Sequence, residues 1–160
     1  MTEKPRSQRT RVRREPDRGH YDRATIDAIL DAGVIAHVGF VSGDGQPLVI
    51  PMLYARDGDR LLIHGSSASR LLTTLDEGVD MCFTVTLGDG LVVARSAFSS
   101  SFNYRSVVAL GRARAIVEPA AKWEALRLLT EFIIPGRWED CRQPNEQELK
   151  ATAILEMPID

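Results

Sequence analysis

Three turn signals containing Asp-Gly constrain this 160-residue chain more than any other feature, because each follows a run with the pattern of a β-strand. Gly, Asp and Asn adopt the backbone conformations of tight hairpin turns, and hairpins join antiparallel strands. The turn signals are Ser-Gly-Asp-Gly at 42–45, Asp57-Gly58 and Gly88-Asp89-Gly90. The strand-like runs are 34–41, 48–55, 61–64, 79–87, 91–97, 104–117 (bent at Gly111) and 152–157. We predict an antiparallel sheet of five or six strands, joined mainly by hairpins, that closes into a barrel.

Four segments of the chain have helical patterns, one before the first strand and three between later strands. Asp22 is placed to cap a helix at about 23–32, and Pro119 to open another at about 120–133. A helix at about 67–77 follows the third strand, and a short one lies near 144–150. The fold class is therefore mainly β (α+β), with helices at the ends of the barrel.

The length suits one domain, which we place at 16–160. The first residues, 1–15, have no apolar period and are rich in basic side chains, so we expect a flexible, solvated basic arm. The basic residues are Lys4, Arg6, Arg9, Arg11, Arg13 and Arg14. A net charge of −2 gives no general case for nucleic-acid binding.

The remaining composition favours a cytoplasmic protein without a structural metal. No apolar run approaches the roughly 18 residues of a membrane span, and no apolar segment follows the basic start as in a signal peptide. The two cysteines, Cys82 and Cys141, lie far apart, and His20, His37 and His64 are scattered. Neither pattern has the spacing of metal ligands.

The segment from Leu61 to Leu75, LLIHGSSASRLLTTL, carries the clearest candidate site. It has the pattern of a buried strand, a loop of small residues and a helix start, where unpaired N–H groups and the helix dipole favour an anion. The candidate phosphate-binding residues are His64, Gly65, Ser66, Ser67, Ser69 and Arg70. Ser66 or Ser67 capping a helix that never meets a ligand explains the same pattern, so the residues alone leave both interpretations open.

Four segments in this order resemble the flavin-binding split-barrel superfamily named for pyridoxamine 5'-phosphate oxidase, and within it the branch of nitroimidazole-resistance (Nim) proteins. They are RVRREPDRGHYD at 11–22, GVIAHVGFVSGDGQPLVIPMLYARDGDRLLIHGSSASR at 33–70, SFNYRSVVALGRARAIVEP at 101–119 and GRWEDCRQPNEQELKATAILEMPID at the end. The resemblance implies a homodimer of six-stranded split barrels with FMN in clefts between the subunits.

The resemblance also assigns roles to individual positions. The backbone of the strand at Pro51, Met52, Leu53 and Tyr54 would face the isoalloxazine ring, and the His64–Arg70 segment would hold the flavin phosphate. Tyr104 and Ser106 begin a strand that would reach the cofactor from the same or the partner subunit. Tyr54 is equally explained as a core aromatic residue with a satisfied hydroxyl. His64 is the candidate for a catalytic role, as a donor to the flavin or its substrate.

The leading functional hypothesis is an FMN-dependent oxidoreductase acting on a small molecule, with nitroreductase-like chemistry suggested by the Nim resemblance. A flavin carries the electrons itself, which suits a chain without a recognisable Ser-His-Asp set or paired catalytic carboxylates. The alternative is a binding or carrier protein of the same fold for flavin, deazaflavin or haem, with His64 or His37 as the plausible axial ligands. A dimer that has lost its ligand is a third reading. Pyridoxamine-phosphate oxidase activity is not expected, because the basic signature for the substrate phosphate is absent.

Overall fold

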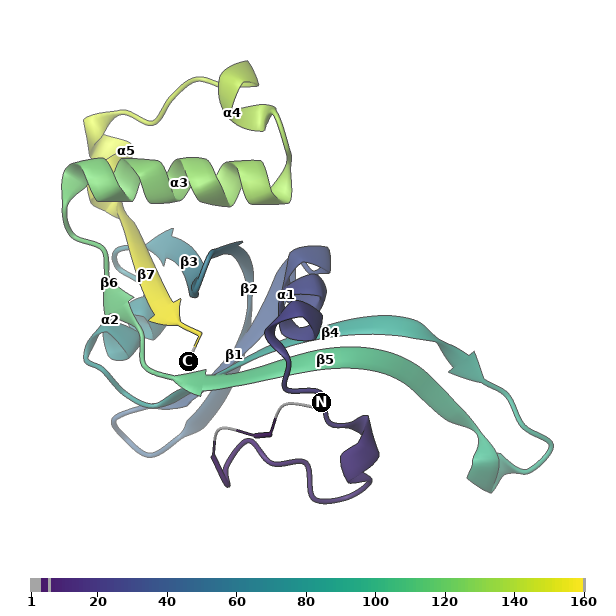
Figure 1. Ribbon diagram of the computed structural model, residues 1–160. Helices are drawn as coiled ribbons and strands as arrows, with labels where there is room; N and C mark the ends of the chain where they lie inside the picture. The colour runs from purple at the N-terminus through teal and green to yellow at the C-terminus, as the bar shows by residue number, and fades with distance from the viewer. Residues whose placement is uncertain (1–3, 6, 160) are drawn as a thin grey trace.

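The computed structural model describes residues 4, 5 and 7–159, and its central feature is one antiparallel sheet of seven strands (Figure 1). The strand order is β5-β4-β1-β2-β3-β7-β6. The bounds are β1 Ile35–Val41, β2 Pro47–Asp57, β3 Arg60–Ser66, β4 Met81–Val92, β5 Ser101–Gly111, β6 Arg114–Ala115 and β7 Thr152–Pro158. The long strand β2 joins two halves of the sheet, because it pairs with β1 over Pro47–Leu53 and with β3 over Tyr54–Asp57.

The two edges of this sheet are neighbours in the chain, and this forces the sheet to curl. β5 forms one edge and ends at Gly111, whereas β6 forms the other edge and begins three residues later at Arg114. Gly111 lies so close to β7 that a Cβ atom there would be 3.2 Å from the Met157 sulfur. The sheet is therefore a split barrel, as predicted, with seven strands rather than six.

The strands differ from the predicted runs at two places: one predicted turn is wrong, so two runs form a single strand, and the run at 104–117 forms two strands. Gly88-Asp89-Gly90 does not reverse the chain; β4 continues through it to Val92, and the register with β5 shifts between Gly88 and Gly90. The Asp-Gly chemistry here forms a β-bulge, which uses the same glycine conformations as a turn. The actual reversal is farther along, at the short 3-10 helix Ala97–Ser99. The predicted strand at 104–117 is in turn divided into β5 and β6 around Arg112.

The helices agree with the sequence patterns, although one begins later than expected. Asp22 caps α1 (Arg23–Ala32) by accepting a hydrogen bond from the Thr25 N–H at 2.9 Å. The helix predicted from residue 67 begins only at Arg70, as α2 (Arg70–Asp76). The other elements are a 3-10 helix Pro16–Arg18, α3 (Pro119–Ile133), α4 (Arg137–Asp140) and α5 (Glu146–Ala151). The α4 turn has no counterpart in the sequence prediction.

Alternation along the strands places one apolar set inside the barrel and another under α3. The inner cluster includes Tyr54, Phe83 and Leu30, with α1 and α2 contributing to it. The outer cluster joins Leu62 and Ile154 of the sheet to Leu129 of α3, which lies across β2, β3 and β7 (Figure 1). One half of the outer surface of the sheet is therefore covered by α3. The helices α1 and α2 pack against the inner surface.

The predicted basic arm at 1–15 lies partly outside the described residues, since positions 1–3, 6 and 160 are not described. In the remaining part, the Val12 N–H donates to the Tyr21 hydroxyl at 2.8 Å, and residues 7–10 form a turn. The flexibility of the arm stays a prediction. Within the described chain, no helix is long and apolar enough to cross a membrane.

Candidate functional site

The strand positions predicted to hold a cofactor separate onto the two faces of the sheet. On β2, Met52 and Tyr54 face the inner core, whereas Pro51 and Leu53 face outward. On β3, Leu61 and Ile63 belong to the inner core, so His64 and Ser66 lie on the outer side with Leu62. A ligand can therefore meet the side chains of only some of these candidates.

Tyr54 is a core residue. Its side chain is fully buried, its ring packs edge-on against Phe83 with centroids 5.2 Å apart, and its hydroxyl donates to the Leu30 carbonyl at the end of α1. Burial, with a smaller contribution from the nearby Asp31 carboxylate, raises the pKa of Tyr54 to about 12. Only the backbone of Tyr54 remains available for the role predicted from the sequence. Gly65 also faces inward, where a Cβ atom would be 3.0 Å from Leu72.

The serine loop has a more ordered structure than a simple cap. The N-cap of α2 is Ser69 rather than Ser66 or Ser67, and the Ser69 hydroxyl makes no capping hydrogen bond within the described residues. The Ser66 hydroxyl accepts from the Ala68 N–H at 3.2 Å, and the Ser67 N–H donates to the Ala151 carbonyl at 2.8 Å. These bonds tie the loop to itself and to the last residue of α5, just before β7.

The same loop leaves several donors available at the start of α2. The first N–H groups of a helix have no intrahelical partner, and Ser69 does not supply one with its side chain. Ser67 and Arg70 are exposed, and no ion pair among the described residues involves the Arg70 guanidinium. Hydroxyl, guanidinium and N–H donors together suit a phosphate.

His64 is the polar side chain that most needs a partner. Its Nδ1 atom is buried and has no hydrogen-bond partner among the described residues. Burial lowers the pKa of His64, so the imidazole is neutral at pH 7. A neutral imidazole nitrogen can accept a hydrogen bond or bind a metal, and His64 lies just before the serine loop.

The uncovered half of the outer sheet surface, here called the open face, consists of the outward positions of β1, β4, β5 and the first half of β2. No Asp, Glu, Lys or Arg occupies any of these positions. They are Ile35, His37, Gly39 and Val41; Pro47, Val49, Pro51 and Leu53; Cys82, Thr84, Thr86 and Gly88; and Phe102, Tyr104, Ser106, Val108 and Leu110. A sheet face exposed to water normally carries charged residues, so an uncharged face of this composition is typical of an interaction surface.

Sequence reasoning named Pro51, Leu53, Tyr104 and Ser106 on this face but did not identify the face as a whole, because it searched for individual contacts rather than for a second apolar set. The available signal was the second apolar set in the same strands: Ile35, Val41 and Val49 alternate with the core residues Ala36, Val38 and Phe40. A strand that is apolar on both faces is typical of a sheet that packs on both sides.

Within one copy, the predicted site residues form two groups. Tyr54 pairs with Ile63, so Leu53 and His64 lie next to each other at the junction of β2 and β3. Tyr104 and Ser106 lie on β5, four strands from β3 in the order of the sheet. At about 4.8 Å per strand, this separation is about 19 Å. The structure therefore places Tyr104 and Ser106 on the open face but away from the serine loop of the same copy.

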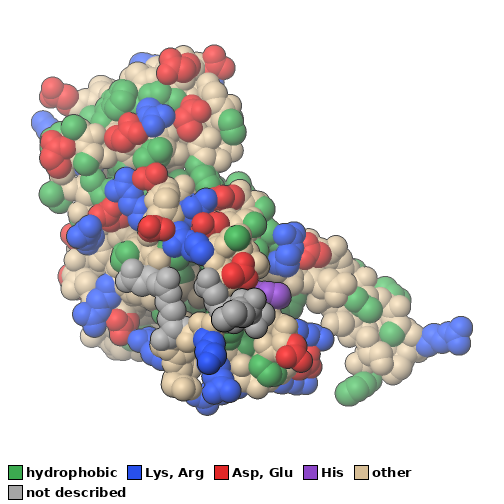
Figure 2. Space-filling view, in the orientation of Figure 1, with side chains coloured by type: hydrophobic (Ala, Val, Ile, Leu, Met, Phe, Trp, Pro, Cys, Tyr) green, Lys and Arg blue, Asp and Glu red, His purple; other side chains and the backbone are tan. Residues whose placement is uncertain are grey.

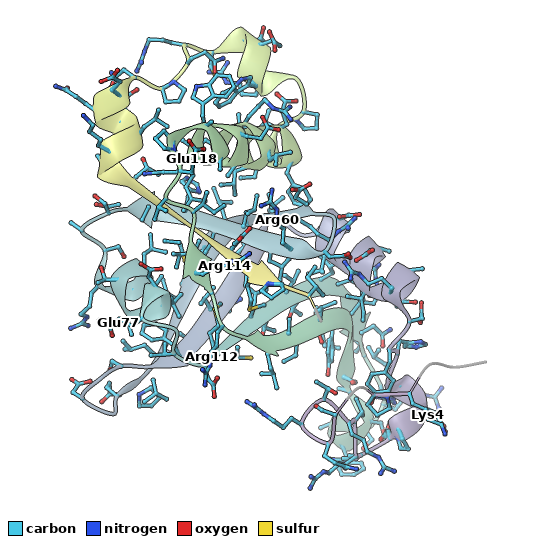
Figure 3. The ribbon with its side chains drawn as sticks, turned by 60° about the vertical axis from the view of Figure 1, so that its left-hand side comes forward. Lys4, Arg60, Glu77, Arg112, Arg114 and Glu118 are labelled. Atoms are coloured by element: carbon cyan, nitrogen blue, oxygen red, sulfur yellow. The ribbon has the colours of Figure 1, made fainter. Side chains whose placement is uncertain are left out.

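Two concavities lie elsewhere on the described surface. One, of about 630 Å³, is lined by Lys4, Pro5, Ser7, Gln8 and Arg11. The other, of about 370 Å³, lies at the seam of the barrel beside Arg60, Arg112 and Arg114 (Figure 3). There Glu156 accepts from Arg60 at 2.7 Å and from Arg114 at 2.8 Å. These charges already satisfy one another. Among the described residues, no group of three or more His, Cys, Asp or Glu side chains could hold a metal ion.

Comparison with known proteins gives a consistent result. Residues 22–160 match the family model described as pyridoxamine 5'-phosphate oxidase. The flavocytochrome Anf3 from Azotobacter vinelandii is 46% identical, with a TM-score of 0.89 over 96% of this chain and 71% of that chain. An FAD and haem binding protein from Mycobacterium smegmatis is 42% identical, with a TM-score of 0.82 over 87% of this chain and 67% of that chain.

A more distant structure shares the fold. A protein assigned to 5-nitroimidazole antibiotic resistance in Bacteroides thetaiotaomicron is 22% identical, with a TM-score of 0.73 over 87% of this chain and 80% of that chain. No curated protein matches the chain by sequence.

Proposed function

The chain belongs to the pyridoxamine 5'-phosphate oxidase family, and we propose on this basis that it is a flavin-binding redox protein. The observation that carries the proposal is the 46% identity, over nearly the whole chain, to a flavocytochrome. The second similar structure, at 42% identity, is named as binding FAD. The open face and the serine loop supply what such a ligand needs, an apolar surface beside a cluster of phosphate donors.

In this proposal the serine loop holds the flavin phosphate. Ser67, Ser69 and Arg70 would donate to its oxygens, together with the first N–H groups of α2. The ring would lie over the outward side of β2 at Pro51 and Leu53, next to His64. When bound, the flavin supplies the electron or hydride transfer, and the protein supplies binding and orientation. FMN is the flavin we expect, and FAD would use the same phosphate site.

We further propose that the site is formed between two copies of the chain. The open face is a broad surface rather than an enclosed cleft, and a cofactor site normally buries most of its ligand. Tyr104 and Ser106 lie four strands from β3 and its serine loop in the same copy, about 19 Å measured along the curled sheet by the strand spacing. In a homodimer they would reach the flavin held by the other copy.

Haem is a second candidate ligand, alongside the flavin rather than in place of it. Both similar structures above 40% identity have names that include haem or a cytochrome. The unpartnered, buried Nδ1 of His64 and its lowered pKa fit an axial ligand. His37, on the open face, is the other histidine that a bound haem could reach from the described residues.

The absorption spectrum of the purified protein tests these proposals. Flavin bands that disappear on dithionite reduction support flavin binding, and chromatography of the released cofactor distinguishes FMN from FAD. A Soret band after reconstitution with haemin supports the second ligand, and its loss in His64→Ala assigns the ligand. A colourless protein that binds neither FMN nor FAD refutes the proposal.

Turnover is tested separately from binding. We propose a small-molecule oxidoreductase, and NADH or NADPH oxidation in the presence of a nitroaromatic compound tests nitroreductase-like chemistry. A protein that binds flavin but oxidises neither nucleotide would act as a carrier or would take its electrons from another protein.

A further inference from the structure

The serine loop, residues 66–69, is joined to α5 by a backbone hydrogen bond. The Ser67 N–H donates at 2.8 Å to the carbonyl of Ala151, the last residue of α5. This bond continues the β3–β7 ladder by one residue beyond the pair of Ser66 and Thr152. No hydrogen bond of the exposed Ser67 hydroxyl is found among the described residues, so the hydroxyl is available for a phosphate while the N–H fixes the loop.

The position of Ala151 depends on how α5 is capped, because α5 has only six residues and so short a helix is marginal by itself. A capping box closes its N-terminus, where Asn145 and Glu148 each accept from the other's backbone N–H. At the C-terminus the last carbonyls have no intrahelical partner. The Thr152 hydroxyl donates to the Glu148 carbonyl at 2.8 Å, and the Ser67 N–H takes the Ala151 carbonyl. The end of α5 therefore places the serine loop.

Lys122 of α3 supplies a further bond at this end of α5. Its ammonium group donates to the Leu149 carbonyl at 2.6 Å, across 27 residues of sequence. Acidic side chains gather at the surface over α3, α4 and α5 (Figure 2), yet no ion pair among the described residues involves the half-buried Lys122. A charged donor makes a stronger hydrogen bond than a neutral one, and positive charge is favourable at a helix C-terminus. Lys122 thus uses its charge to hold α5 rather than to pair with a carboxylate.

The helix that carries Lys122 is itself fixed on the sheet. Ala125 and Leu129 of α3 are buried in the outer cluster against the sheet. Figure 1 shows α5 beside the first turns of α3, with β7 running from α5 into the sheet. Lys122 lies three residues before Ala125, so a packed helix presents its ammonium group to α5.

We propose that Lys122 is a positioning residue for the phosphate site, acting through α5 and not by contact with the flavin. It fixes the end of α5, and the Ala151 carbonyl there holds Ser67. The proposal rests on the phosphate role proposed for the serine loop and names a residue outside the loop on which that role depends. The Ser67 hydroxyl and the first N–H groups of α2 must converge on one phosphate, so a displaced loop loses several contacts together.

A matched set of variants of the full chain tests the proposal by flavin titration. Lys122→Met keeps the apolar stem and removes the ammonium group, whereas Lys150→Met removes an exposed ammonium group from α5 itself. Lys122→Met should lower the affinity for FMN about 10-fold and that for riboflavin, which lacks the phosphate, less than about 2-fold. Lys150→Met should bind both as the unchanged protein does, and Lys122→Arg, which keeps a charged donor, should recover most of the FMN affinity. Equal losses for FMN and riboflavin in Lys122→Met would show a general structural defect and overturn the proposal.

Amide hydrogen exchange followed by NMR tests the same contacts in the flavin-free protein. The Ser67 N–H should exchange at least about 5-fold faster in Lys122→Met than in the unchanged protein or Lys150→Met, while Leu62 in the middle of β3 keeps its rate. An unaltered rate at Ser67 overturns the positioning role.

The two proposals fail in different ways. If the unchanged protein binds neither FMN nor FAD, the proposed function is refuted, and the phosphate role of Lys122 is refuted with it. If the unchanged protein and Lys122→Met bind FMN with equal affinity, the positioning role alone is refuted.

Discussion

Tyr54→Phe isolates one buried hydrogen bond and tests whether Tyr54 belongs to the core or to the ligand site. The substitution removes only the hydroxyl and keeps the ring against Phe83 and Phe132. The hydroxyl donates to the Leu30 carbonyl, one of the carbonyls at the end of α1 that lack an intrahelical partner. Phenylalanine leaves that carbonyl buried and unpaired, which costs about 1–3 kcal/mol. In a domain of this length the midpoint of thermal unfolding should fall by about 2–12 °C.

Differential scanning calorimetry measures the effect, and Tyr104→Phe is the control. Within one copy Tyr104 is 61% exposed on β5, and no hydrogen bond of its hydroxyl is found among the described residues, so its loss should leave the free energy of unfolding of the flavin-free monomer nearly unchanged. Flavin affinity provides the second measurement. Tyr54→Phe should bind flavin as the unchanged protein does, because its side chain does not reach the outer face. An unaltered unfolding midpoint, or a loss of flavin affinity in a protein of normal stability, would refute this assignment.

The same residue predicts a loss of stability in alkali. The pKa of Tyr54 is raised from 10.0 to about 12, so the folded state favours the neutral phenol. The stabilisation is complete below pH 10.0 and is lost as the pH rises toward about 12. Urea unfolding over this range should show a steeper loss for the unchanged protein than for Tyr54→Phe. Parallel curves would contradict the burial of the phenol.

Three further substitutions test the core, the seam and the site. Gly33→Ala puts a Cβ atom 2.5 Å from the Val85 side chain and should cost about 1–3 kcal/mol in urea unfolding. Burial alone would raise the pKa of Glu156, but hydrogen bonds from Arg60 and Arg114 outweigh it and lower the pKa. Glu156→Gln should therefore destabilise the protein at neutral pH, and its difference from the unchanged protein should shrink below pH 4.5; a constant difference would contradict this. His64→Leu removes a buried nitrogen without a partner, so it should unfold at an equal or higher temperature while losing affinity for flavin or haem; a large loss of stability would show that His64 is structural.

Much of the fold could be predicted from local chemistry. Asp22 and Pro119 mark the starts of two helices correctly, because capping and the missing proline N–H act within one turn. Gly88-Asp89-Gly90 misled the prediction because turns and bulges use the same residues, and only pairing with β5 decides between them. The position of β6 at the far edge depends on curling of the whole sheet, which no local pattern records.

The site was less predictable than the fold. The serine loop could be recognised as a connection from a strand to a helix, since Ser is common at helix N-termini, but the N-cap residue is Ser69 rather than Ser66 or Ser67. The roles of Met52 and Tyr54 depend on which face each residue occupies, and a shift of one residue exchanges the faces. When a strand is apolar on both faces, the alternation of its residues does not show which face lies in the core.

Tyr54 and His64 lie close together on adjacent strands and show why the outer face is the one to examine for function. Tyr54 faces inward, and its polar atom is already bonded to α1, so it has no remaining capacity for a ligand. His64 faces outward, and its Nδ1 is buried without a partner, which costs free energy that a ligand or a second copy could recover. Among the described residues, the inside of the barrel holds no buried side-chain nitrogen or oxygen without a hydrogen-bond partner, whereas the outer side has the His64 imidazole, the donors of the serine loop and an uncharged face. From this distribution we expect ligand binding on the outer side of the sheet, since the polar groups inside are already used for stability.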